Sequence, residues 1–366
     1  MSGNIIGERF VAVSFGESHG RCVGVIVDGC PAGLPINEQD IQAKLDLRKP
    51  GQSIVTTQRK EEDRVEIISG VFNGNTTGAP ICMIIWNKDQ DSKPYEQLKG
   101  KPRPGHADYP AMMKYAGFND YRGGGRFSGR ITATFVMAGA LAQKLLEQAL
   151  GIEVLAYTLE IGGIRANGLT IDEIRKLRYS NEVRCPDANT ADKMKEAILK
   201  AKSSGDSLGG VIECTALNMP IGLGEPVFGA LESDLSKALF AIPAVKGIEF
   251  GSGFEGSKRK GSENNDIYKV EDGKIVTVTN NSGGILGGLS NGMPLLLRVA
   301  FKPASSIAKT QHTVDLSNME ETEITVPGRH DPCVVPRAPP VVESIVSLIL
   351  ADHAIKYGLI APVLKR

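Results

Sequence analysis

The chain has 366 residues, 41% of them hydrophobic, and its 42 basic residues balance its 42 acidic ones. This length can bury a core without disulfides or metal staples, and the balanced charge argues against a dedicated nucleic-acid binder. The six scattered cysteines form no CxxC pair, which suits a reducing compartment and gives no support to a zinc or redox-dithiol site. Neither a signal peptide nor an apolar run of the roughly 20 residues that span a bilayer is evident. We therefore expect a soluble, cytoplasmic protein with no metal site and no nucleic-acid or membrane partner.

Strands and helices are predicted along the whole chain, in an irregular order. Strands are expected first, at 10–15, 23–27, 65–68 and 80–86, followed by helices at 131–149 and from Thr190 through 202. A strand at 210–214, a helix at 232–240, strands at 274–278 and 295–300 and a helix at 341–357 come next. Thr190 is a suitable N-cap, and Gly151 follows the end of the first helix. The irregular order favours an α+β fold, and the lack of a low-complexity linker predicts one domain over residues 1–366.

Three of the five histidines, His19, His106 and His330, lie in loop-like segments dense with Gly, Pro and Asp. Histidine titrates near neutral pH and serves acid–base chemistry, and functional residues concentrate on loops. A single loop histidine is most often a surface or capping group, but three together favour a catalytic site. His353 falls within the last predicted helix, which indicates a structural role.

The turn at 16–20 also matches the G-x-S-x-G pattern of a hydrolase elbow, with Ser18 as its nucleophile. Such an elbow needs a strand, a sharp turn and then a helix. Residues 23–27 instead have the β-rich composition of a strand. A serine hydrolase therefore stays open only as the alternative function.

The segment from Gly100 to Thr134 is locally positive, with six basic residues against Asp108 and Asp120. Within it, residues 123–130 combine three glycines with two arginines and lead into the first long helix. Free N–H groups at a helix start and bidentate arginines both favour an anion such as phosphate. A basic solvated face is the simpler alternative. The pattern is not a Walker A loop, and no Rossmann fingerprint is present.

Many short motifs occur together and in one order along the chain. They include GESHG at 16–20, TTQR at 56–59, RPGHADY at 103–109, DYRGGGR at 120–126, FSGR at 127–130, GDSLGG at 205–210, GLGEPVF at 222–228, GGILGG at 283–288, KPASS at 302–306 and GRHDPC at 328–333. Through them the chain resembles the chorismate synthase family from residue 7 to about 352. A single motif could arise by chance, but the ordered set is highly specific.

The resemblance implies a fold in which helices are sandwiched between antiparallel sheets, assembled as a homotetramer. It implies a carbon–oxygen lyase of the shikimate pathway to aromatic amino acids. The implied reaction is the anti 1,4-elimination of phosphate from 5-enolpyruvylshikimate 3-phosphate to give chorismate, and it requires reduced FMN without net redox change. A non-catalytic protein that binds flavin or an anion is the remaining alternative.

Residue roles also follow from the resemblance. His19 is expected to protonate the departing phosphate, His106 to donate a proton to the flavin, and Asp331 to act as a base through the flavin N5. The residues implied to hold the substrate are Arg48, Arg126 and Arg130. Those implied to contact FMN are Arg126, Ser128, Ala244, Gly284, Lys302, Pro303, Ala304, Ser305, Ser306 and Arg329.

Four positions depart from the family pattern: Lys49, Ile54, Phe127 and Pro243. Ile54 stands where relatives often carry an Arg linked to nicotinamide cofactor binding, so direct use of NADPH is doubtful. We therefore expect reduced FMN to come from a separate flavin reductase. The other three departures affect individual ligand contacts and leave the expected chemistry intact.

Overall fold

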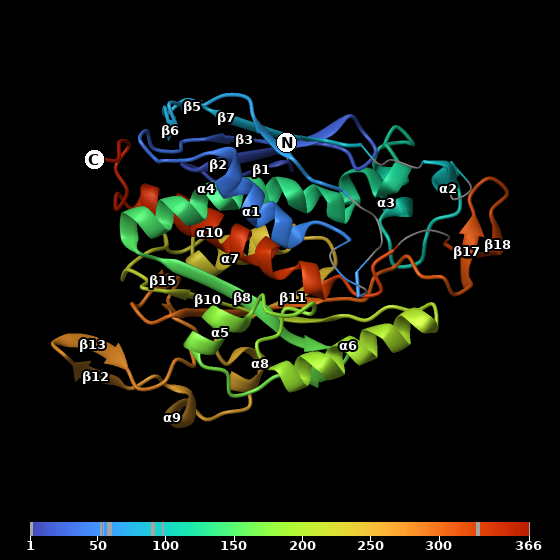
Figure 1. The fold of residues 1–366 in the computed structure, drawn as a ribbon. Helices are drawn as coiled ribbons and strands as arrows, with labels where there is room; N and C mark the ends of the chain where they lie inside the picture. Colours follow the sequence, from blue (N-terminus) through green and yellow to red (C-terminus); the bar gives the residue numbers. More distant parts are fainter. Residues whose placement is uncertain are drawn as a thin grey trace.

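Two five-stranded antiparallel sheets enclose a layer of helices in the computed structural model of this chain (Figure 1). The structure describes residues 3–51, 53, 55–56, 61–88, 92–96, 99–326 and 330–365. This arrangement confirms the α+β prediction and the implied sandwich of helices between antiparallel sheets. One hydrophobic core runs through both sheets and the helices between them.

The first sheet comes from the N-terminal quarter of the chain. Its strand order is β1 (Ile5–Ile6), β2 (Val11–Gly16), β3 (Cys22–Asp28), β7 (Ile81–Trp86) and β4 (Val65–Ile67). In β7 the side chains of Ile81, Met83 and Ile85 are buried, while the residues between them are more exposed. This alternation turns one face of the sheet toward the helices.

The second sheet is built from the middle and later parts of the chain. Its strand order is β11 (Val245–Phe250), β16 (Leu295–Phe301), β10 (Gly210–Leu217), β8 (Glu153–Ile161) and β9 (Ile164–Arg165). Strand β16 alternates in the same way, with Leu295, Leu297, Val299 and Phe301 buried. Its last residue leads directly into the 302–306 segment.

Four helices fill the space between the sheets: α1 (Glu38–Arg48), α4 (Thr132–Leu150), α7 (Leu231–Leu239) and α10 (Pro339–Lys356). Helix α4 packs closely on α10, since a Cβ on Gly139 would lie 2.2 Å from the Cβ of Ser344. Residues 339–354 of α10 are all buried, as expected for a helix enclosed on all sides. The buried ring of His353 lies 3.0 Å from Asp234 Oδ2 of α7, which confirms its structural interpretation.

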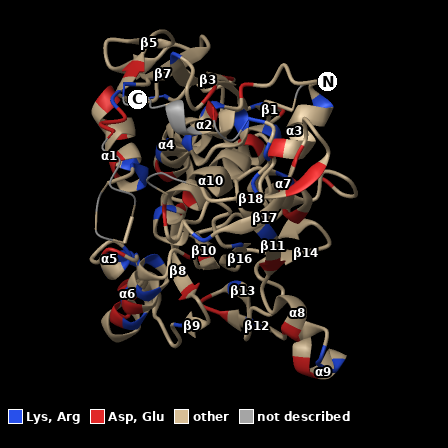
Figure 2. Ribbon diagram, turned by 90° about the vertical axis from the view of Figure 1, so that its right-hand side faces the viewer, with Lys and Arg blue, Asp and Glu red and all other residues tan. Residues whose placement is uncertain are grey.

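Smaller elements surround the sandwich. Helix α5 (Ile171–Leu177) and the highly charged α6 (Ala188–Ser203) lie outside the second sheet (Figures 1 and 2). Hairpins are formed by β5 (Val71–Phe72) with β6 (Asn75–Thr76), β12 (Tyr268–Glu271) with β13 (Lys274–Thr277), β14 (Ile285–Leu286) with β15 (Leu289–Ser290), and β17 (Gln311–Asp315) with β18 (Glu320–Ile324). Short helical segments are α2 (Lys93–Glu96), α3 (Asp108–Lys114), α8 (Gly253–Gly256), α9 (Gly261–Asn264) and the 3-10 turns η1 (Arg122–Phe127), η2 (Gly129–Ile131) and η3 (Val335–Arg337).

Most predicted elements are present, but one helix start was wrong. Helix α6 begins at Ala188, and its N-cap is Asp187, whose carboxylate accepts the N–H of Asn189 and the hydroxyl of Thr190. The predicted cap, Thr190, thus lies inside the first turn. Among the helices of the described residues, none is long and apolar enough to cross a membrane.

Candidate active site

The turn at 16–20 joins β2 to β3 and carries His19 into the interior, where the residue is only 5% exposed. Its Nδ1 lies 2.9 Å from Ser92 Oγ. The ring edge packs on Tyr95, with centroids 5.2 Å apart and planes at 81°. The remaining side of the ring faces Gly123, where an added Cβ would lie 2.5 Å from His19 Nε2. Burial and these neighbours fix the imidazole in one orientation.

Ser18 lies beside His19 in the same turn and is almost fully buried. Its hydroxyl accepts a hydrogen bond of 3.1 Å from Ser128 Oγ. The turn continues into strand β3, whereas a hydrolase elbow continues into a helix. This geometry does not support the serine-hydrolase alternative.

His106 belongs to a second polar cluster, with Asp108 and Arg103. Its Nδ1 lies 2.6 Å from Asp108 Oδ1. Because an ionised carboxylate only accepts, Nδ1 carries a hydrogen. The other ring nitrogen, Nε2, lies 3.3 Å from Arg103 NH2. Arg103 donates to both oxygens of the same carboxylate, at 2.7 and 2.8 Å. Burial raises the pKa of Asp108, but the hydrogen bonds from Arg103 and His106 outweigh it, so its pKa lies well below the ordinary value.

The 302–306 segment docks on this second cluster from the end of β16. Ser306 Oγ accepts from Arg103 at 3.0 Å, and Ser305 Oγ donates to the carbonyl of Gly105 at 2.7 Å. Lys302 Nζ donates to Ser305 Oγ at 2.6 Å, and burial together with Lys246 lowers the pKa of Lys302. Segments about 200 residues apart in sequence therefore meet here.

Two further hydrogen bonds hold the 302–306 segment in place. The backbone N–H of Lys302 donates to the carbonyl of Ala244 at 2.9 Å, and Ser207 Oγ donates to the carbonyl of Ala304 at 2.7 Å. Ala244 has a left-handed φ of +72°, which places it in a tight bend before β11. The structure thus places Ala244 beside Lys302, in the segment whose Ser305 contacts Gly105.

Arg48 and Arg130 meet in a buried ion-pair cluster. Both donate to Asp63, Arg48 at 2.6 Å, and Arg130 also pairs with Glu61 at 2.7 Å. Burial lowers the pKa of Arg48 to about 10, against the opposing charge of Asp63. Burial raises the pKa of Asp63, but the two arginines outweigh it and hold its pKa below the ordinary value. Two of the three predicted substrate arginines, Arg48 and Arg130, are thus side by side, and Arg126 is not part of this cluster.

Asp331 is linked to this ion-pair cluster through Arg337. The carboxylate of Asp331 accepts from Arg337 at 2.5 Å, and Arg337 Nε donates to the backbone carbonyl of Arg48 at 3.0 Å. Arg337 was not among the predicted site residues. Its basic side chain beside the GRHDPC motif is the only sequence signal that could have suggested it.

Other predicted residues lie apart or outside the described part of the chain. Arg126 is half-buried and donates to the carbonyls of Gly16 and Ser14, which ties η1 to the end of β2. Gly284 lies beside Pro294, at the opposite end of the β11–β16 pair from Lys302. Arg329 and Ile54 fall outside the described residues. Of the remaining departures, Lys49 pairs with Asp46 at 2.9 Å.

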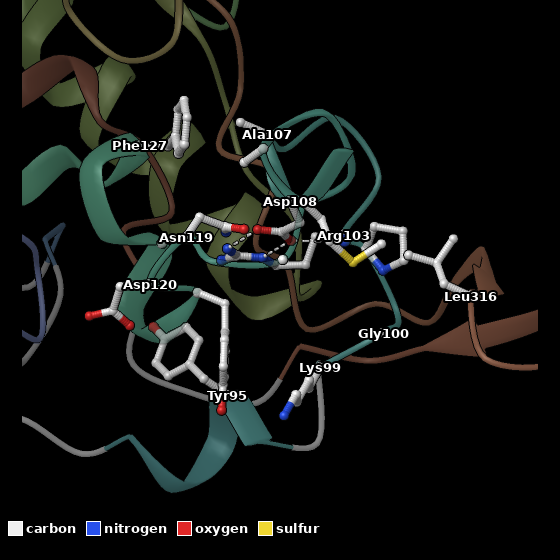
Figure 3. Close-up of a pocket in the computed structure, with 16 residues that line it drawn as sticks. Tyr95, Lys99, Gly100, Arg103, Ala107, Asp108, Asn119, Asp120, Phe127 and Leu316 are labelled. Atoms are coloured by element: carbon white, nitrogen blue, oxygen red, sulfur yellow. Dashed lines mark hydrogen bonds and ion pairs between the residues drawn. The ribbon is translucent and has the colours of Figure 1, made fainter. Parts of the chain in front are cut away.

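A pocket of about 150 Å³ opens beside the His106 cluster (Figure 3). Aromatic side chains and charged groups line it together, among them Tyr95, Arg103, Asp108, Asp120 and Phe127. Arg103 forms ion pairs with Asp108 in the middle of the view. Gly124 also lines the pocket and lies near the ring of His106: an added Cβ would lie 3.4 Å from His106 Cε1.

Comparisons with known proteins identify the family of this chain. The family model described as chorismate synthase matches residues 10–355. A protein named chorismate synthase from Korarchaeum cryptofilum is 58% identical over 356 residues, which are 97% of this chain and 98% of that protein. One of the same name from Methanosarcina acetivorans is 52% identical over 362 residues, 99% of each chain. A solved crystal structure of a chorismate synthase is 29% identical and superposes with a TM-score of 0.74, covering 96% of this chain and 93% of that one.

Proposed function

The chain belongs to the chorismate synthase family and is a carbon–oxygen lyase, and we propose that its substrate and reduced FMN bind where His19 and His106 approach Gly123 and Gly124. The observation that carries the proposal is this convergence of two histidines on two consecutive glycines. Each ring has a nitrogen held by a protein partner, Ser92 for His19 and Asp108 for His106. The other nitrogen of each ring lies on the side of the glycine segment, Nε2 of His19 against Gly123 and Nε2 of His106 near Gly124.

The residues around His106 fit FMN in chemical character. Lys302 offers a cation and the hydroxyl of Ser306 offers a donor, both suited to a polar cofactor, and Gly105 and Gly124 add no side chains beside them. Reduced FMN, when bound, supplies the transient electron density that weakens the carbon–oxygen bond to phosphate. In this proposal His106, as the imidazolium, would donate its Nε2 proton to the cofactor and be left as the neutral ring, with Nδ1–H still on Asp108.

The leaving phosphate is proposed to receive its proton from His19. Negative charge develops on the departing phosphate and must be neutralised. A positioned general acid typically raises the rate of such a step by about 10²–10⁴-fold. Arg48 and Arg130 would hold the anionic groups of the substrate. Arg48 Nε is buried without a hydrogen-bond partner among the described residues, and an anionic oxygen would satisfy it. Asp331, held by Arg337, would act as the base.

The roles of the two histidines are testable by phosphate release from 5-enolpyruvylshikimate 3-phosphate under anaerobic conditions with chemically reduced FMN. His19→Ala and His106→Ala should each lower kcat by about 10²–10⁴-fold. A matched control is His312→Ala, since His312 lies exposed on β17, outside the site. If neither the wild type nor the variants release phosphate, the proposed function is refuted. A wild-type kcat in either histidine variant would remove that residue from the mechanism.

We further propose a cytoplasmic homotetramer of single-domain subunits. The described surface exposes large apolar side chains such as Phe228 at 95%, Val227 at 77% and Phe254 at 75%, a feature that favours burial between subunits. The six free cysteines fit a reducing compartment, and the continuous core fits a single domain. Light scattering should give about four times the 39.1 kDa of one chain. A monomer at micromolar protein would contradict the tetramer.

A further inference from the structure

Asn87, the residue after β7, joins two parts of the candidate active site. Its Nδ2 donates to the carbonyls of Glu17 at 3.1 Å and Gly20 at 2.9 Å. Those two carbonyls lie on either side of Ser18 and His19. At its other end, Oδ1 accepts from Arg130 Nε at 3.0 Å. A single amide therefore contacts both the turn at 16–20 and the buried ion-pair cluster.

The position of Asn87 is itself fixed by the first sheet. Cys22 of β3 pairs with Trp86 of β7, one residue before Asn87. The backbone N–H of Asn87 also donates to the carbonyl of Arg21 at 3.0 Å. The β3–β7 pairing and this hydrogen bond together hold the backbone of Asn87. Its side chain therefore keeps the turn at 16–20 in a fixed position relative to the sheet.

The amide of Asn87 also orients the guanidinium of Arg130. Its terminal nitrogen NH1 pairs with Asp63 and Glu61, while Nε is held by Asn87. A guanidinium is planar, so contacts at two different nitrogens fix the direction in which its remaining donors point. An uncharged amide suits this place, because it provides both donors and an acceptor. A carboxylate would offer no donor to the turn and would add a third negative charge beside Asp63 and Glu61.

We propose that Asn87 is a positioning residue, which holds the turn of His19 and the guanidinium of Arg130 in a fixed relation, so that proton donor and cation act on the same leaving phosphate. This inference rests on the proposed function. Asn87 itself does not touch the reacting atoms. It acts through His19 on the proton transfer and through Arg130 on the binding of the substrate.

A double-mutant cycle on kcat tests the action through His19. The four proteins are wild type, Asn87→Leu, His19→Ala and the double variant, assayed for phosphate release with reduced FMN at saturating substrate. Asn87→Leu should lower kcat by about 10²-fold, the cost of a small misplacement of a catalytic group. The double variant should be nearly as active as His19→Ala alone, because residues that act as one unit are not additive. If the fold-loss in kcat of the double variant equals the product of the two single-variant losses, the inference is overturned. A wild-type kcat in Asn87→Leu would overturn it as well.

Two further variants separate positioning from a folding defect. Asn75→Leu is the matched control, since its amide donates to Asn73 within the β5–β6 hairpin, and it should keep wild-type kcat. Asn87→Asp keeps the shape and the acceptor for Arg130 but loses both donors to the turn, so its kcat should also fall. If Asn87→Leu fails to bind FMN, Asn87→Asp takes its place in the cycle. A wild type without phosphate release would instead refute the proposed function.

Discussion

Gly123 leaves the space in which the imidazole of His19 lies: a Cβ built on Gly123 would come within 2.3 Å of His19 Cδ2. Its φ of +60° is also a left-handed value that residues with a side chain rarely adopt. The next residue, Gly124, has the same relation to His106 at a longer distance, 3.4 Å. The triple glycine therefore brings the two catalytic candidates to one segment of backbone.

The first prediction concerns Gly123→Ala. The added methyl group should displace His19 and lower kcat by about 10²-fold, while FMN still binds. Gly129→Ala is the matched control, because nothing lies within 4 Å of its added Cβ. Phosphate release with reduced FMN measures both. Equal kcat for the two variants would show that the contact between Gly123 and His19 does not matter for catalysis.

A second prediction concerns the pairing of Asp108 with His106. Asp108→Ala removes the acceptor that fixes Nδ1, and we expect kcat to fall by about 10- to 100-fold, less than the roughly 10²–10⁴-fold of a general acid. Asp108→Asn keeps an oxygen acceptor and should lose less. As a control, Asp206→Ala removes an exposed carboxylate that pairs with Lys309, and its kcat should not change. An Asp108→Ala enzyme as fast as the control would exclude this positioning role.

Local pattern predicted much of the fold but less of the site. Helix α4 was predictable because an Ala- and Leu-rich run ends at Gly151 in the left-handed conformation. Helix α1 was missed because it is mostly polar, and it buries only Ile41, Leu45 and Arg48. Strand β8 was also missed, although it is the longest strand of the second sheet.

Contacts between distant segments explain the rest of what the sequence could not show. The FMN residues around Lys302 were predicted from a loop motif, but their docking on Arg103 depends on how β16 ends against the RPGHADY segment. Likewise Asp63 lies 15 residues from Arg48 and 67 from Arg130. No spacing rule connects such residues, so their roles emerge only from the packed structure.

The third prediction concerns the buried pair of Arg48 and Asp63. Asp63→Asn removes the carboxylate that the buried guanidinium groups of Arg48 and Arg130 share, so the free energy of unfolding should fall by about 3–5 kcal/mol. The control is Asp46→Asn, which breaks the exposed pair with Lys49 and should cost at most about 1 kcal/mol. Urea unfolding at one protein concentration measures both variants.

The effect of Asp63→Asn should also depend on pH in one direction. The folded-state pKa of Asp63 lies below its ordinary value, which is about 3.9 in an unfolded chain. The stabilisation is therefore fully present above about pH 4 and is lost as the pH falls through the lower folded-state pKa. The difference between wild type and Asp63→Asn should stay constant from pH 5 to 8 and narrow in acid. A difference that grows in acid would contradict this assignment.

A fourth prediction concerns Asp352 of α10, which anchors the N-terminal segment. Its buried carboxylate accepts the backbone N–H groups of Glu8, Arg9 and Phe10, at 2.6–3.1 Å. Asp352→Ala leaves these three N–H groups without their acceptor, and we expect a loss of about 3 kcal/mol in the free energy of unfolding. Asp28→Ala, which removes an exposed local contact to Gly29, is the control. Similar urea midpoints for both variants would show that the anchor is dispensable.

The last prediction is that this chain does not reduce its own flavin with NADPH. A nicotinamide 2′-phosphate needs a dedicated cation, because the dianion gives up strong hydration when it binds. Ile54 offers no such donor. Arg48 is a cation close to it in sequence, but the proposed function already assigns Arg48 to the anionic groups of the substrate. Under anaerobic conditions, dithionite-reduced FMN should support full turnover, whereas oxidised FMN with NADPH should give almost none. Comparable rates from the two, in a preparation free of other reductases, would show that a different cation binds the dinucleotide, and Lys49, whose side chain is 34% exposed, would be the first residue to replace.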